Sequence, residues 1–207
     1  MKSMINIISS LRSSKKFTYI ALAFSSLFMA SCDDEDGFYN EKYANTGELV
    51  TIDIQPTYAV GDFLYVDADF GRYQSEEGFP QLLDIYETTS GAPGFVFTYL
   101  MEKESSPGIW TPVSTTLQQL QVNSGTAQAG NFVLGTALYN ASDETYEYNV
   151  GYPLTSAGNY RLSFGVNSDS ANKIELRSKT QGNKLFLNLI SSTTQLTGGG
   201  FYTFTVN

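Results

Sequence analysis

The chain has 207 residues, enough for one domain of ordinary size with a leader and a linker before it. Its 21 acidic residues outnumber the 12 basic ones, for a formal net charge of −9, and so acidic a surface excludes nucleic acid as a partner because it repels phosphate backbones. The absence of histidine excludes Ser-His-Asp and Cys-His catalysis and any histidine-ligated zinc or haem site.

The first 31 residues have the features of a secretory leader. Four basic residues and no acidic residue precede residue 17, and residues 17–29 are apolar apart from one threonine and two serines. This run has the length of a signal-peptide core and is shorter than the roughly 20 residues of a membrane-spanning helix. We therefore expect residues 1–31 to be a signal peptide.

The leader ends in Met29-Ala30-Ser31-Cys32, which resembles a bacterial lipobox. The resemblance implies that Cys32, the only cysteine of the chain, becomes the acylated first residue of the mature protein. Bacterial lipoproteins of this type carry two or three acyl chains, and each buried methylene contributes about 0.8 kcal/mol, so the anchor is expected to be stable. The alternative is a signal peptide cut nearby, with Cys32 left as a free thiol.

The next four residues are all acidic: Asp33, Asp34, Glu35 and Asp36. They resemble the acidic export signal of Bacteroidota lipoproteins, which implies display at the cell surface; a solvated linker is the alternative for any charge run. Polar, turn-prone residues continue to Thr46. We therefore expect an acylated tether over 32–46 and one folded domain over 47–207.

The remaining chain shows the two-residue alternation of half-buried β-strands, and no run after the leader has helical periodicity beyond about two turns. Strands are expected in GELVTIDIQ, YAVGDFLYVDADF, FVFTYLME, NFVLGTALYN, TYEYNVGYPL, NYRLSFGV, KIELRS, LFLNLI and FYTFTV. A short strand or helical turn is expected near 82–86. For LQQLQV we expect a strand, with a brief helix as the alternative. About nine or ten short strands predict a sandwich or a barrel.

One local pattern refines this expectation. The segment Ser156-Ala157-Gly158-Asn159-Tyr160-Arg161-Leu162 resembles the Asp-x-Gly-x-Tyr-x-Cys corner of immunoglobulin-type domains. The resemblance implies that the Tyr160 hydroxyl bonds back to the backbone and that Leu162 faces the core. Leu162 replaces the cysteine, so a disulfide-free, fibronectin-like domain is implied. We expect an all-β, Ig-like antiparallel β-sandwich with Greek-key topology; a jelly roll or lipocalin-like barrel is the alternative.

Five aromatic residues are candidates for a platform that binds sugar rings, whose C–H faces pack on aromatic surfaces. These candidates are Trp110, Tyr99, Tyr65, Tyr146 and Tyr148. The alternative is that they are core residues or cross-strand pairs.

Asp67 and Asp69 share one face of a predicted strand, an arrangement that can hold a cation or serve glycoside hydrolysis. Two acids on a solvated face are the alternative. The sequence contains no phosphate loop, zinc cluster or nucleophile elbow, and we expect neither a metal nor a cofactor.

These features predict a non-enzymatic, lipid-anchored protein of the bacterial outer membrane, facing the cell surface. We expect it to capture a glycan or another extracellular ligand as an accessory of an uptake system. The alternative is a structural or adhesion-type envelope protein that acts through contacts with other proteins.

Overall fold

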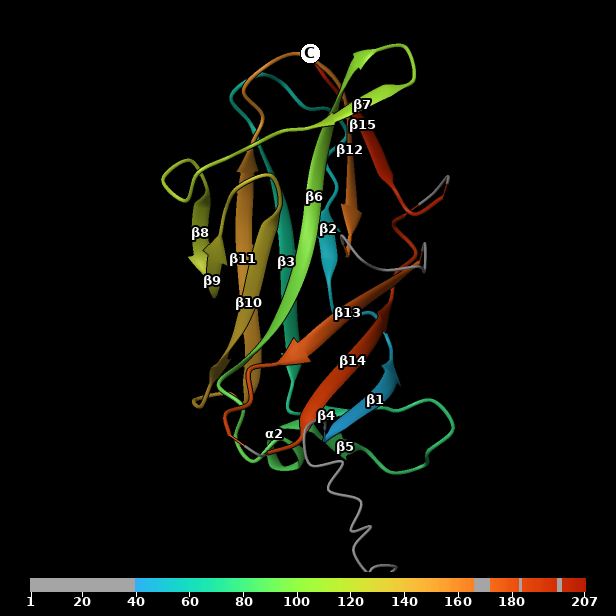
Figure 1. The fold of residues 1–207 in the computed structure, drawn as a ribbon, viewed down its shortest axis with the longest axis vertical. Coiled ribbons are helices and arrows are strands. Elements are labelled where there is room, and N and C mark those ends of the chain that lie inside the picture. The colour runs from blue at the N-terminus through green and yellow to red at the C-terminus, as the bar shows by residue number, and fades with distance from the viewer. Residues whose placement is uncertain (1–39, 166–171, 183, 197–198) are drawn as a thin grey trace, which may run out of the picture. The chain divides into compact units, whose positions relative to one another are not determined.

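The chain folds almost entirely into β-strands, as Figure 1 shows for the computed structural model, which describes residues 40–165, 172–182, 184–196 and 199–207. The strands are β1 (Glu41–Thr46), β2 (Thr51–Asp53), β3 (Phe63–Gly71), β4 (Tyr73–Gln74), β5 (Leu83–Asp84), β6 (Gly94–Ser106), β7 (Ile109–Pro112), β8 (Gln121–Ser124), β9 (Thr126–Gln128), β10 (Val133–Asn140), β11 (Thr145–Pro153), β12 (Gly158–Phe164), β13 (Lys173–Ser178), β14 (Phe186–Ser192) and β15 (Tyr202–Val206). The described helix is α2 (Ile85–Thr88). The predicted all-β class is confirmed.

Thirteen of the strands form one large, curled sheet, and β4 pairs with β5 in a small second sheet. The main path runs β1-β14-β13-β6-β10-β11-β3-β2. Strand β6, 13 residues long, pairs with four others: β10 and β7 on one edge, β13 and β12 on the other. It therefore joins the β13–β14–β1 part of the sheet to the β12–β15 part.

The alternation predicted for β6 is confirmed and builds the centre of the core. Phe95, Phe97, Tyr99 and Met101 are buried, whereas Val96, Thr98 and Leu100 between them are partly exposed. The other main rows of the core come from β3 and β11: Leu64, Val66, Ala68, Phe70, Tyr146, Tyr148, Val150 and Tyr152. Full burial of one large apolar side chain contributes about 1.5–3 kcal/mol, so these rows dominate the stability.

The aromatic side chains of the core pack in both stacked and edge-to-face pairs, and the buried hydroxyls of Tyr99, Tyr146 and Tyr148 have hydrogen-bond partners. The rings of Phe97 and Tyr148 have centroids 5.0 Å apart at 78°. The hydroxyls of Tyr99 and Tyr148 lie 2.9 Å apart, and that of Tyr146 donates to the carbonyl of Ala92 at 3.0 Å. These bonds remove the penalty of burying an unpaired hydroxyl.

The side chain of Gln195 connects the two ends of the strand order. Strand β2 lies at one end, and Gln195 follows β14 near the other. Its Oε1 accepts from the amide of Ile52 at 2.6 Å, and its Nε2 donates to the carbonyl of Ile52 at 2.8 Å. The side-chain amide thus takes the place that a neighbouring strand would have beside β2.

A glycine allows two strands to enter the space between β10 and β11. These two pair with each other only at Leu138–Asn140; further along, β9 pairs with β10 and β8 with β11. Gly125, between β8 and β9, has φ +73°, and a Cβ there would lie 2.6 Å from the carbonyl oxygen of Thr136. Only glycine fits this position.

The predicted extent of the tether was wrong at its C-terminal end. Residues 41–46, assigned to the tether, form β1, which pairs in parallel with β14. Only Ala44 and Thr46 of this strand are buried, so its sequence carries no clear apolar alternation. Backbone hydrogen bonds to β14 order the segment, and a polar sequence does not reveal them.

The tyrosine corner predicted at Tyr160 is confirmed locally. The Tyr160 hydroxyl donates to the carbonyl of Ser156 at 2.8 Å and lies 2.9 Å from the Ser156 hydroxyl. Both Tyr160 and Leu162 are buried. The corner fixes the turn that leads into β12.

Three other segments differ in detail from their predictions. The strand expected in GELVTIDIQ shrinks to β2, and Ile54 at its end is exposed. The segment 82–86 contains both alternatives, a piece of β5 and the start of α2. In LQQLQV the first four residues form a turn, and the last two begin β8, so the strand prediction holds only for its end.

We predict that the fold loses stability above about pH 10. Burial raises the pKa of Tyr99, Tyr146, Tyr148 and Tyr152 above the ordinary value of 10.0, so these hydroxyls stay neutral in the folded chain. The unfolded chain releases these protons first, so the contribution of these four tyrosines to the free energy of unfolding is constant below about pH 10 and falls as the pH rises above it. Urea titrations across this range, with tyrosinate absorbance followed in parallel, test this. Ionisation of all tyrosines near pH 10 with the fold intact would contradict it.

We also predict that Gln195→Ala lowers the free energy of unfolding by about 1–3 kcal/mol, because it removes two hydrogen bonds from the partly buried backbone of Ile52. Gln81→Ala, at an exposed loop position, is the control and should change stability by less than about 0.5 kcal/mol. Equal effects of the two substitutions in urea unfolding would show that the contact is incidental.

Candidate functional site

An open hollow of about 370 Å³ lies beside β2 and the start of β3. Its lining combines aromatic, acidic and amide side chains: Asp53, Gln55, Thr57, Tyr58, Gly61, Asp62, Phe63 and Tyr65. Its volume is in the range of small-ligand sites, which usually join an apolar wall to a few placed polar groups.

A tight turn forms one side of this hollow. Asp62 accepts from the amide of Ala59 through its side chain at 2.7 Å, and its own amide donates back to the carbonyl of Ala59 at 3.1 Å. Gly61 has φ +100°, a conformation that favours glycine. The turn is fixed to the sheet, because the amide of Gly61 donates to the carbonyl of Leu154 at 2.8 Å.

Tyr58 forms the buried floor. Its hydroxyl accepts from the amide of Gln55 at 3.0 Å and donates to the carbonyl of Asp53 at 3.3 Å. Its ring packs against Phe204 of β15 at 4.9 Å between centroids. The segment 53–58, which carries the polar side chains of Asp53 and Gln55, is therefore fixed to the core through Tyr58.

Phe63 and Tyr65 form the aromatic wall. Both belong to the outer face of β3, between buried Leu64 and Val66, and their ring centroids lie 6.3 Å apart at 41°. A Cβ added to Gly151 of β11 would lie 2.8 Å from the ring of Tyr65, so this ring covers the glycine. Both aromatic residues remain partly exposed.

The exposed polar groups of the hollow are two carboxylates, one amide and one hydroxyl. They belong to Asp53, Asp62, Gln55 and Thr57, all of which are exposed. Carboxylates accept hydrogen bonds from hydroxyls, and the amide both donates and accepts. Together with an aromatic face, this set suits a polyhydroxylated ring.

The predicted aromatic platform is wrong for three of its five residues. Tyr99, Tyr146 and Tyr148 are buried in the core, because they belong to the inward rows of β6 and β11. Their rings pack against other core rings and present no face to solvent. Tyr65 is the candidate that lines the hollow.

Trp110 is partly exposed but does not line the hollow around Tyr65. The guanidinium of Arg161 lies 4.7 Å from its ring centroid and 4.0 Å from that of Phe201. The Nε of Arg161 also donates to the carboxylate of Glu102 at 2.6 Å. The arginine is held by both rings and one carboxylate, an arrangement that stabilises the β6–β12 surface.

Asp67 and Asp69 lie on the outer face of β3, as predicted. Asp67 accepts from the Asn149 amide at 2.6 Å, and Asp69 is paired across the strands with Glu147. Partial burial and then the charge of Glu147 raise the pKa of Asp69. The described residues contain no group of three or more acidic, histidine or cysteine side chains that could hold a metal.

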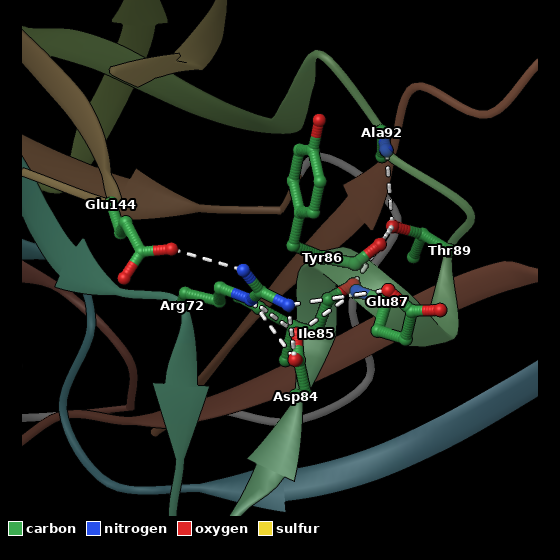
Figure 2. A network of polar contacts seen from close by, with 8 residues as sticks. All are labelled: Arg72, Asp84, Ile85, Tyr86, Glu87, Thr89, Ala92 and Glu144. Carbon is green, nitrogen blue, oxygen red and sulfur yellow. Dashed lines mark hydrogen bonds and ion pairs between the residues drawn. The ribbon is translucent and has the colours of Figure 1, made fainter. Parts of the chain in front are cut away.

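A second polar cluster surrounds Arg72 at the end of β3, as Figure 2 shows. Arg72 donates through Nε and Nη2 to the carboxylate of Asp84 at 2.6–2.9 Å, and through Nη1 to Glu144 at 3.0 Å. These bonds lower the pKa of Asp84, which also caps α2 by accepting from the amide of Glu87. Each of the three guanidinium nitrogens of Arg72 donates to a carboxylate within the protein, so we interpret this cluster as an anchor for the segment 72–91.

The predicted signal peptide, Cys32 and the acidic run 33–36 lie outside the described residues. No helix in the described part of the chain has the length and hydropathy needed to cross a bilayer.

Sequence reasoning missed most of the hollow. Phe63 was not among the predicted site residues, although it shares the outward face of β3 with Tyr65. Asp53 and Gln55 lie where a longer strand was predicted. The Gly61-Asp62 turn signal and the outward position of Tyr65 were available from the sequence. They did not reveal that the segment after β2 folds back beside β3.

Comparisons with known proteins add no assignment: no protein-family model, curated protein or solved structure matches the chain.

Proposed function

We propose that this chain is a lipid-anchored, non-enzymatic binding protein of the bacterial outer membrane, facing the cell surface. The lipobox-like segment ending at Cys32 and the acidic run after it support the anchor and the surface location. The single observation that supports a binding function is the hollow in which Phe63 and Tyr65 stand beside Asp53, Gln55 and Asp62.

The chemistry of this hollow favours a glycan as the ligand. The C–H face of a sugar ring packs on an aromatic side chain, and ring hydroxyls donate to carboxylates. An open hollow also suits one or two residues of an extended chain better than an enclosed small molecule. The proposed role is capture of such a chain as an accessory of an uptake system.

We retain the Ig-like sandwich as part of the proposal. The hydrogen bond from Tyr160 to Ser156 and the burial of Leu162 support it, because both match the corner of immunoglobulin-type domains. An Ig-like architecture also has to accommodate two further features of this sheet. Strand β1 pairs in parallel with β14, and β6 pairs with four other strands.

For the binding site, we predict that Tyr65→Ala weakens glycan binding by about tenfold or more, a loss of roughly 1.4 kcal/mol. The reason is that the substitution removes an aromatic face, while the inward neighbours of Tyr65 keep β3 in place. Glycan arrays identify the ligand first, and calorimetry then compares the variant with the unmodified domain. Tyr43→Ala is the matched control, because Tyr43 is exposed on β1 and does not line the hollow.

Unchanged affinity in the Tyr65→Ala variant, or equal losses in both variants, would contradict the site. Silence across all glycans together with stable co-purification of an envelope protein would instead favour a structural or adhesion role.

For the anchor, we predict that Cys32→Ser moves the protein from the membrane fraction to the soluble fraction. The serine cannot carry a thioether-linked lipid, so the affinity supplied by the acyl chains is lost. Fractionation with mass spectrometry of the mature N-terminus tests this. Unchanged membrane association, or an unacylated N-terminus in the unmodified protein, would contradict it.

A further inference from the structure

The most exposed large apolar side chains of the described residues gather where the chain enters the domain. Phe79 is 64% exposed, Leu82 63% and Tyr43 61%, the three highest values among the large hydrophobic residues. Tyr43 lies on β1, and the other two lie on the loop between β4 and β5. Isolated apolar residues on a surface need no explanation, but these belong to one end of the domain.

Backbone hydrogen bonds hold this loop beside β1. The amide of Glu77 donates to the carbonyl of Asn45 at 3.0 Å. The amide of Phe79 donates to the carbonyl of Glu76 at 3.1 Å and closes a tight turn, in which Gly78 has φ +86°. Figure 1 shows the loop at the end where β1 begins, with β4, β5 and α2, while β7 lies at the opposite end. The apolar side chains are therefore carried by an ordered loop.

The length of the tether limits how far this end can lie from the bilayer. The described chain begins at Asn40, eight residues after Cys32. A fully extended chain spans about 3.3–3.6 Å per residue, so Asn40 lies no more than about 30 Å from an acylated Cys32. A shorter, coiled tether brings the end closer. The apolar loop, which lies at this end of the domain, therefore stays within reach of an anchoring bilayer.

We infer that this end of the domain, through Phe79, Leu82 and Tyr73, inserts into the headgroup region of the membrane that anchors the protein. Tyr73 is 52% exposed and lies on β4, the strand that precedes the loop. The inference rests on the proposed acylation of Cys32. Aromatic and aliphatic side chains partition favourably into this region. The anchor holds the loop at high effective concentration near the surface, so a weak insertion is enough to orient the domain.

The charges beside the loop select the kind of lipid surface. Glu76 and Glu77 stand three and two residues before Phe79, and Lys42 is exposed on the adjoining β1. The two carboxylates outnumber the one ammonium group, so anionic headgroups are expected to weaken the contact. When this end is inserted, the hollow around Tyr65 and the end that carries β7 remain exposed to solvent.

The single tryptophan, Trp110, allows a direct test. In a Trp110→Phe background, Phe79→Trp places the only indole on the loop, and Ile109→Trp places it at an exposed position of β7. The acylated variants are reconstituted into phosphatidylcholine vesicles with and without brominated acyl chains. We expect a blue-shifted emission and roughly twofold quenching for Phe79→Trp, and neither change for Ile109→Trp. Replacing part of the lipid with phosphatidylglycerol at low salt should reduce the quenching.

The proposed membrane contact of the loop and the proposed acylation of Cys32 can be tested separately. Mature chain from residue 32 onward carries one thiol, Cys32, and can be coupled to a maleimide lipid whether or not cells acylate it. Quenching of the Phe79→Trp indole in the coupled protein supports the contact, and no quenching overturns it. Equal quenching at both positions also overturns the contact. A blue shift that appears without vesicles and grows with protein concentration overturns it in favour of self-association. Mass spectrometry of the native N-terminus tests the anchor independently.

Discussion

The inward row of β6 is the constraint on which the rest of the fold depends. Its alternate residues from Phe95 to Met101 must face the core, and this orientation fixes the faces of the four strands that pair with it. A shift of register by one residue would turn the row outward and expose four large side chains. The rows of β3 and β11 complete the core opposite this strand. The buried tyrosine hydroxyls then determine which rings can lie together, because each needs a partner.

The surface features of the domain follow from this arrangement. Since every second residue of β3 is committed to the core, the outward residues are free to differ, and they carry the aromatic wall at one end and the acidic pair further along. Phe63 and Tyr65 belong to β3, whereas Asp53 ends β2 and Gln55 follows it in the segment that leads to β3. The candidate site thus combines an aromatic wall on a strand with polar groups at a strand end and in a connecting segment, where binding residues are often found.

Much of the fold could be predicted from the sequence, since two-residue alternation marks strands whose one face is buried. It identified β3 and β6 correctly, and the local corner at Tyr160 matched its hydrogen bond. Alternation cannot tell which buried aromatic residues are available to a ligand, so Tyr99 and Tyr148 were proposed as surface residues although they line the core. Alternation also fails to predict β1, because this strand is held in place by backbone pairing with β14 and not by a buried apolar row. The hollow could not be predicted, because it depends on how residues distant in sequence fold back on one another.

The contact between Gln195 and Ile52 has a consequence for proteins crowded on a membrane. An unpaired strand edge offers its backbone to any copy of the same protein and so promotes association into extended sheets. By occupying both backbone groups of Ile52, the glutamine amide blocks such growth from β2 at the cost of one side chain. On the proposed lipid anchor, copies of the protein would meet far more often than copies that diffuse freely. Blunting this edge would then allow dense packing of the anchored copies without aggregation through β2.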